Sequence, residues 1–241
     1  MIVHDKKHMT WGVLMTIIYA GILIFMFSNT FQGRVPGEKI NAFKASDNLF
    51  NSIAKGSTNY FPTLLEENKK FMDHSINLTI NLSNDAVVEK GSELLQRTGV
   101  SVQTVDTKIT VQGQLGHILE AGILDAQAMF KNQEQQLMNV YGLEGRKVTY
   151  VWWHIFNALE KSLTKAGDFK AAKFVGRANK RGVEVGYNFY GISSQSATDK
   201  AGILTFSLVF YVLYTLWWGF SIFFLFEGLG LRMSSGAKKE V

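Results

Sequence analysis

The sequence predicts a membrane protein in which two terminal transmembrane α-helices flank one extramembrane α+β domain. Three observations support this fold class. The runs 11–31 and 203–226 contain no charged residue, and each is long enough to cross the roughly 30 Å of bilayer hydrocarbon. Between them, about 170 residues show both helical and alternating hydrophobic periodicity. We therefore expect a mainly helical domain with a small antiparallel or mixed sheet and a long helical hairpin.

The first span follows a basic start and predicts an uncleaved signal anchor at 11–31. Its apolar stretch is longer than the roughly 7–15 residues of a removable signal, and the sequence FSNTFQGR at its end offers no small-x-small cleavage site. Small residues recur every four positions within the span, at Gly12, Thr16 and Ala20. Because such a stripe lets another helix approach closely, these three residues are predicted helix contacts.

The second span, 203–226, carries aromatic residues through its middle as well as at its ends. Tyr and Trp normally gather at the membrane interfaces, whereas four of them lie centrally here: Tyr211, Tyr214, Trp217 and Trp218. Since each hydroxyl or indole N–H needs a partner inside hydrocarbon, we expect these four residues to contact another helix. A flat hydrophobic cofactor such as a quinone, or plain exposure to lipid, would also fit the pattern, but no cofactor is predicted.

Lysine and arginine are denser near the two ends of the chain than in the segments that follow the first span and precede the second. By the positive-inside rule, residues 1–10 and 227–241 are predicted to be cytoplasmic tails. Residues 32–202 then form the extracytoplasmic, periplasmic domain of a two-pass protein of the inner (cell) membrane.

Short elements within the domain can be placed from their periodicity. Alternating apolar residues predict strands at 76–82, 105–111 and 182–191. Cap residues, or a proline at the opening, predict helices at 46–55, 62–74 and 83–99. In the first of these helices the expected cap is Ser46 or Asp47.

The longest helical pattern, 113–141, predicts the first arm of the hairpin. Its seam has a period of 3.5 residues and consists of Leu119, Ile123, Ala126, Phe130, Gln133, Leu137 and Val140. After a turn at 142–145, a second seam consists of Val148, Trp152, Ile155, Leu159, Ser162 and Ala166. The two helices can therefore pack antiparallel. The seam is either the core of the domain or an oligomer contact in which Gln133 fixes the register.

Basic residues gather on one face of a helix predicted at 168–181. They are named the basic stripe and comprise Lys170, Lys173, Arg177, Lys180 and Arg181. The opposite face carries Ala171, Ala172, Val175 and Ala178, which should pack inward. The stripe is a solvated face, a contact for anionic lipid headgroups, or a contact for an acidic partner. Nucleic acid is not an expected partner, because no aromatic residues are interleaved with these cations.

No catalytic, cofactor-binding or metal site is predicted. The absence of cysteine excludes disulfides and thiolate chemistry. The five histidines fit no metal-binding motif, and no nucleophile elbow or phosphate-binding loop occurs. The protein is therefore predicted not to be an enzyme.

These observations predict a non-enzymatic accessory or scaffolding subunit of a membrane complex, which contacts membrane lipids and is either homo-oligomeric or bound to larger partners. The alternative is an extracytoplasmic binding module for a lipid, a quinone or an anionic ligand. In topology alone the arrangement resembles the bacterial polysaccharide co-polymerases. The proline-rich segment beside the second span of that family is missing here, where Pro36 and Pro62 are the only prolines.

Overall fold

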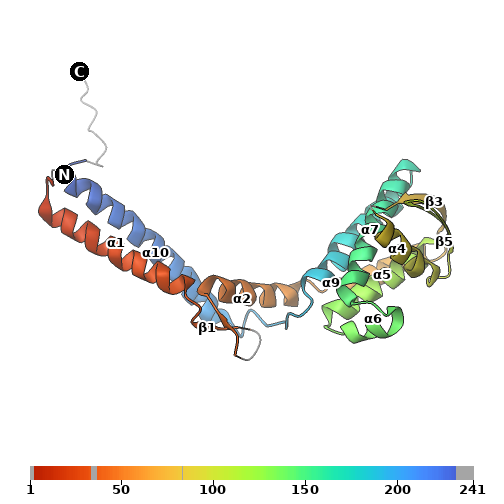
Figure 1. The fold of residues 1–241 in the computed structure, drawn as a ribbon, viewed down its shortest axis with the longest axis horizontal. Coiled ribbons are helices and arrows are strands. Elements are labelled where there is room, and N and C mark those ends of the chain that lie inside the picture. Colours follow the sequence, from red (N-terminus) through yellow and green to blue (C-terminus); the bar gives the residue numbers. More distant parts are fainter. Residues whose placement is uncertain (1–2, 34–36, 83, 232–241) are drawn as a thin grey trace, which may run out of the picture. The chain divides into compact units, whose positions relative to one another are not determined.

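The computed structural model is mostly helical and contains a small antiparallel sheet (Figure 1). It describes residues 3–33, 37–82 and 84–231. The chain divides into two compact units, of which the first comprises Met1–Ile53 with Gln195–Val241 and the second comprises Ala54–Ser194. The prediction of a mainly helical chain with a small sheet is thus confirmed.

Two long helices, α1 (Lys6–Phe27) and α10 (Ala201–Gly228), pack against each other in the first unit (Figure 1). The pair is antiparallel, because the start of α1 lies beside the end of α10. The amide of His4 donates to the carbonyl of Gly228 at 3.0 Å, and the carboxylate of Asp5 caps α1 by accepting from the next amides. Of the two predicted tails, residues 1–2 and 232–241 lie outside the described residues.

By length and composition, α1 and α10 could each cross a membrane, and they are the two such helices in the described part of the chain. Only 6% of the most apolar window of each helix is buried, so their apolar side chains face outward instead of filling a core. A signal sequence near an N-terminus can share the length and composition of α1.

The helix predicted at 46–55 is present but begins earlier, as α2 (Ala42–Ser57). Its N-terminal amide at Lys44 donates to the side chain of Asn41 at 2.9 Å, so the expected cap at Ser46 or Asp47 is wrong. Before it, β1 (Phe31–Gln32) and β2 (Lys39–Ile40) form a short antiparallel pair. The first unit therefore includes part of the segment that was expected to belong to the 32–202 domain.

The second unit contains a three-stranded antiparallel sheet in the order β3-β5-β4, with β3 at Ser75–Asn81, β4 at Ser101–Val105 and β5 at Lys108–Gln114. The strand predicted at 76–82 is confirmed. The strand predicted at 105–111 is confirmed only over 108–111, which belong to β5. Near its start the chain reverses, and Asp106 adopts a left-handed φ of 51°. Val105 and Lys108 therefore pair with each other across the turn.

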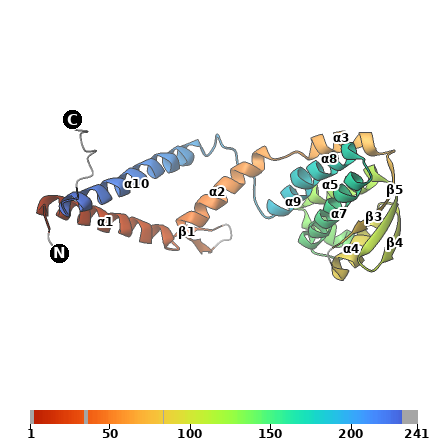
Figure 2. The same ribbon diagram turned by 90° about the horizontal axis from the view of Figure 1, so that it is seen from above.

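The helices of the second unit surround one apolar core beside this sheet (Figure 2). They are α3 (Phe61–Asn68), η1 (Lys69–Phe71), α4 (Asp85–Gln96), α5 (Leu115–Phe130), α6 (Glu134–Tyr141), α7 (Gly145–Lys165), α8 (Phe169–Ala178), the π-helix η2 (Asn179–Val183) and α9 (Glu184–Asn188). The helices predicted at 62–74 and 83–99 correspond to α3 with η1 and to α4. As expected, a proline opens α3, and the side chain of Asn84 caps α4.

The first arm of the predicted hairpin is not one helix but two, because the chain breaks between α5 and α6. Asn132 takes a left-handed φ of 60° at the break. Gln133 precedes α6 instead of lying within a seam, and Val140 is 52% exposed. The continuous seam and the register role of Gln133 are therefore wrong.

Antiparallel packing of α5 on α7 is nevertheless present. A β-carbon on Gly122, in the middle of α5, would lie 2.7 Å from the ring of Phe156 on α7. Gly145, at the start of α7, faces Met129 near the end of α5. Four residues of the second seam are fully buried, namely Val148, Trp152, Ile155 and Leu159.

The strand predicted at 182–191 is helical instead, in η2 and α9. Its alternating pattern does not match its burial, since Val183 is buried while Tyr187 is exposed. Gly186 lies directly against the backbone of Ala126 on α5. The glycine thus permits close approach of two helices and does not mark a strand.

A half-buried carboxylate links α5, α6 and α7. The Oδ2 atom of Asp125 accepts hydrogen bonds from the hydroxyl of Tyr141 and from the indole N–H of Trp152, both at 2.7 Å. Burial raises the pKa of Asp125, and the two hydrogen bonds act in the opposite direction. The network therefore joins three helices around one poorly solvated charge.

Replacing Asp125 with asparagine should remove a pH dependence from the stability of the second unit. A carboxyl group whose pKa is higher in the folded state than its unfolded value of about 3.9 favours folding more as the pH falls. The natural protein should therefore gain stability relative to Asp125→Asn as the pH is lowered from 7 through the raised pKa, until both states are protonated below about 3.9. Urea unfolding of both proteins at pH 7 and pH 4 measures this difference, and parallel pH profiles would contradict it.

Candidate functional site

The basic stripe lies on α8 and η2, and the face opposite to it is buried as expected. That buried face consists of Ala171, Ala172, Val175 and Ala178. Lys170, Lys173 and Lys180 are exposed, and none of them forms an ion pair with another residue that the structure describes. These three amines are therefore available to a partner.

The two arginines of the stripe have partners within the second unit. Arg177 forms an ion pair with Glu67 on α3 and lies 5.4 Å from the ring centre of Phe174. Arg181 lies over the ring of Tyr60 at 5.0 Å. Arg177 therefore links α8 to α3 through its ion pair. The basic stripe is thus not uniformly exposed to solvent.

The predicted contacts of the first span fall into two groups. Gly12 is buried, and a β-carbon there would lie 2.7 Å from the backbone nitrogen of Leu225 on α10. Thr16 is half-buried and its hydroxyl donates to the carbonyl of Gly12 at 2.8 Å. Ala20 faces outward. Of the three small residues, Gly12 therefore lies in the contact with α10 of the same chain, Thr16 lies at its edge, and Ala20 lies outside it.

Three of the four central aromatic residues of α10 contact α1. The rings of Tyr214 and Trp218 stack on Tyr19, with centres 4.3 and 4.6 Å away. The indole N–H of Trp217 donates to the carbonyl of Met15 at 3.0 Å. Tyr211 differs from these three, because it is 65% exposed and makes no ring contact or side-chain hydrogen bond with the described residues of α1.

A groove that the sequence patterns did not reveal lies between α7 and α9 in the second unit. It has a volume of about 330 Å³ and is lined by Thr149, Tyr150, Trp153, Val183, Glu184, Tyr187 and Asn188. Three exposed aromatic rings and one carboxylate dominate this lining. The indole N–H of Trp153 donates to Glu184 at 3.0 Å and so holds the carboxylate beside the ring.

A second groove, of about 400 Å³, lies on the other side of Trp153. It is lined by Asn81, Leu82, Trp153, His154, Asn157, Ala158 and Lys161. The ring of His154 meets those of Tyr150 and Trp153 edge to face, at 4.6 and 4.9 Å between centres. Burial lowers the pKa of His154, which favours its neutral form at pH 7.

A spacing of three to four residues could have indicated this surface, because Tyr150, Trp153 and Asn157 follow one another on the side of α7 that carries no core seam. The sequence patterns predicted the buried seam of α7 but not this outer face. The partner residues Glu184 and Tyr187 could not have been added, since they were assigned to a strand.

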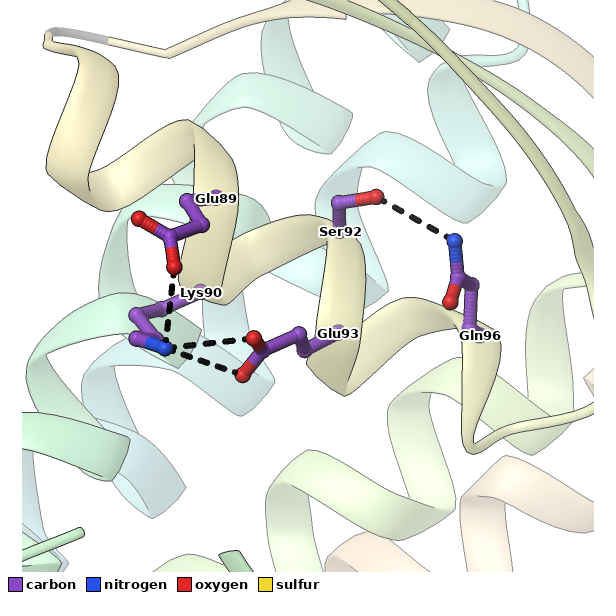
Figure 3. A network of polar contacts seen from close by, with 5 residues as sticks. All are labelled: Glu89, Lys90, Ser92, Glu93 and Gln96. Atoms are coloured by element: carbon purple, nitrogen blue, oxygen red, sulfur yellow. Dashed lines mark hydrogen bonds and ion pairs between the residues drawn. The ribbon is translucent and has the colours of Figure 1, made fainter.

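Other polar clusters of the second unit are structural. On α4, the amine of Lys90 lies 3.1 and 3.2 Å from the carboxylates of Glu93 and Glu89 (Figure 3). These carboxylates raise the pKa of Lys90. The pair with Glu93 is one turn apart on the helix, and pairs of that spacing stabilise a helix surface modestly. Among the residues with described positions, no group of three or more His, Cys, Asp and Glu side chains could hold a metal ion.

Comparison with protein-family models, with curated proteins and with solved structures finds no match to this chain. The class of protein is given by its own geometry. Two long, outward-facing apolar helices pair near the ends of the sequence, and a compact unit of helices with a small sheet is formed by the segment between them. The two grooves beside Trp153 are concave sites of that unit.

Proposed function

We propose that this chain is an accessory or scaffolding subunit of a membrane complex. In this proposal α1 and α10 cross the inner membrane as a pair and anchor an extracytoplasmic domain. The subunit is not an enzyme and acts through the chains that it contacts, either copies of itself or larger partners. The outward-facing side of α10 would supply the contact within the membrane.

The observation that carries the proposal is the position of Tyr211. This residue lies about ten residues after the start of α10, or about 15 Å along the helix axis. Its side chain is 65% exposed, and its hydroxyl makes no hydrogen bond within the described residues. A hydroxyl at that depth of a span needs a partner, because hydrocarbon offers none. A side chain of another protein subunit would satisfy it.

The packing between α1 and α10 further supports contact with other chains. Gly12, Ser221 and Gly228 are the buried residues of the two helices. The small residues that allow close packing are therefore already occupied by the contact between α1 and α10 of the same chain. The large side chains Phe206, Leu208 and Phe220 remain on the outside. A neighbouring helix would therefore meet bulky aromatic and aliphatic groups, whose contact area favours stable association.

A second candidate function is an extracytoplasmic binding module for lipid or for an anionic ligand. It is favoured by the three exposed amines Lys170, Lys173 and Lys180 and by Phe169, which is 68% exposed at the start of α8. An aromatic ring beside lysines is typical of segments that bind anionic membrane surfaces.

Replacing Tyr211 with phenylalanine should reduce the recovery of partner subunits several-fold, because the change removes only the hydroxyl that seeks a hydrogen bond. The full chain is extracted from its native membrane in mild detergent, and the mass of the complex and the co-purified proteins and lipids are determined. Val212→Leu is the matched control, since Val212 is exposed on the same helix and the change exchanges one aliphatic side chain for another without touching a polar atom.

Two outcomes would contradict the scaffold proposal. The first is a monomer that carries no other protein. The second is unchanged recovery of partners in Tyr211→Phe, which would remove the observation on which the proposal rests. Co-purification of anionic lipid without any protein would favour the binding module instead.

A further inference from the structure

The lining of the groove between α7 and α9 combines aromatic faces with a negative charge. Tyr150, Trp153 and Tyr187 are each between about one third and one half exposed. Among the described ring contacts, none joins two of these three rings to each other; instead, Tyr150 and Trp153 each meet the edge or face of His154. The three rings therefore border an open space and do not close it by stacking.

The carboxylate of Glu184 lies in the same lining and has no cationic partner. Its hydrogen bond comes from the neutral indole of Trp153, and no ion pair joins it to any lysine or arginine that the structure describes. The second unit is rich in basic residues, so an uncompensated carboxylate among aromatic rings is a specific feature of this groove. Its charge can be balanced by a ligand.

Rings of this kind attract cations, because the face of an aromatic ring is electronegative. The structure contains an example beside the groove: the guanidinium of Arg146 lies 6.0 Å from the ring centre of Tyr187 and 5.5 Å from that of Tyr190. No lysine or arginine with a described position lines the space between Tyr150, Trp153 and Tyr187. A ligand of low charge density that carries methyl groups can contact several rings at once.

We propose that this groove binds the quaternary or alkylated ammonium group of a small organic ligand. Tyr150, Trp153 and Tyr187 form the aromatic walls, and Glu184 supplies the opposing charge. A volume of about 330 Å³ lies at the small end of ligand sites, which suits a compact cation. The assignment is independent of the scaffold function, because it concerns the second unit alone.

The test uses the full chain in a non-ionic detergent and tetramethylammonium chloride as the probe. Tryptophan fluorescence is followed during titration at constant ionic strength, with sodium chloride making up the difference. Trp153 lines the groove and reports on occupancy. We expect a saturable change with a dissociation constant in the millimolar range. The neutral molecule tert-butanol, of similar size, should produce no saturable change, because it lacks the charge.

Three variants locate the site. Tyr187→Ala should weaken tetramethylammonium binding by at least tenfold, and Glu184→Gln should weaken it about tenfold while preserving the size and shape of the side chain. Phe169→Ala, which changes an exposed ring outside the groove, should bind as the natural protein does. Circular dichroism confirms that each variant is folded, and Glu184→Gln keeps the test decisive if Tyr187→Ala unfolds.

The proposal is overturned if tetramethylammonium gives no saturable signal, if tert-butanol binds equally well, or if Glu184→Gln leaves the affinity unchanged. Choline chloride should compete with the probe. Nanodiscs of phosphatidylcholine, compared with nanodiscs of phosphatidylglycerol, then distinguish the sources of the same chemistry: competition by the former identifies a lipid headgroup, and its absence identifies a free solute.

Discussion

The free energy of unfolding of the second unit should fall by about 3 kcal/mol when Lys55 is replaced by methionine. Lys55 is only 4% exposed, and its amine donates to the carbonyls of Ile192 at 2.5 Å and Phe189 at 3.0 Å. It also lies 4.8 Å from the ring centre of Phe130. Methionine preserves the length of the side chain but removes two hydrogen bonds from a charged donor, a kind worth about 1.5–3 kcal/mol each. Both carbonyls keep one weaker donor, the side chain of Asn132 for Ile192 and the amide of Ile192 for Phe189, which limits the expected loss.

The matched control for this change is Lys44→Met on the same helix. Lys44 is exposed and, within the described part of the chain, forms an ion pair with Asp47 alone, at 3.2 Å; such surface pairs contribute little to stability. Urea unfolding followed by circular dichroism compares both variants with the natural protein. If Lys55→Met and Lys44→Met were equally stable, the buried amine would not be a stabilising contact.

Gly186→Ala should destabilise the second unit by about 2 kcal/mol. A β-carbon at this position would collide with the backbone of Ala126, whose carbonyl carbon would be 2.9 Å away. Backbone cannot rotate aside as a side chain can, so α9 must move from α5, and overpacking of this kind typically costs about 1–3 kcal/mol. The same shift would displace Glu184 and Tyr187, which α9 carries into the groove.

Gly182→Ala tests whether the effect comes from that collision or from the loss of a glycine. Gly182 lies four residues earlier, where an added β-carbon meets only the Cδ1 atom of Leu64 at 3.2 Å. That flexible side chain can give way, and alanine is favoured over glycine by about 0.5–1 kcal/mol within a helix, so the expected loss of stability is less than about 1 kcal/mol. Thermal unfolding of both variants decides the question, and equal stability losses would rule out the specific contact.

Local patterns predicted those elements whose periodicity and end signals agreed. The segment 76–82 alternates in polarity and is also bounded by turns, and it forms β3. In α4 the cap at Asn84 and the positive φ of Gly99 lie at the two ends of an amphipathic run. In such cases the local sequence and the tertiary burial favour the same secondary structure, so that structure can be predicted from the segment alone.

The errors arose where tertiary contacts decided the outcome. The alternating residues at 182–191 fit a strand as well as they fit a helix. The close contact of Gly186 with Ala126, which is distant in sequence, favours the helix. The heptad spacing of 113–141 continues through Asn132, but its side chain bonds to the amide of Gly191 at 2.8 Å and to the carbonyl of Ile192 at 3.1 Å. Those partners lie about sixty residues away in sequence, beyond the range of any local pattern.

For the candidate sites, the sequence identified the basic residues and the small residues, but it did not identify the side chains that contact them. Arg177 was placed correctly on the polar side of α8, while its ion pair with Glu67 depends on how α3 packs. The groove beside Trp153 needs α9 to lie next to α7. The periodicity of one helix at a time cannot predict that α7 and α9 are neighbours.

The pairing of α1 with α10 has a consequence for the time course of synthesis. The two helices are separated by the whole second unit, and at about 5–20 residues per second a ribosome needs roughly 10–35 s to make the intervening segment. During that interval the face of α1 around Gly12 has no α10 to cover it. A newly made α1 is therefore open to other helices, including the α1 of another nascent copy, and the order in which helices emerge can decide which one it meets first.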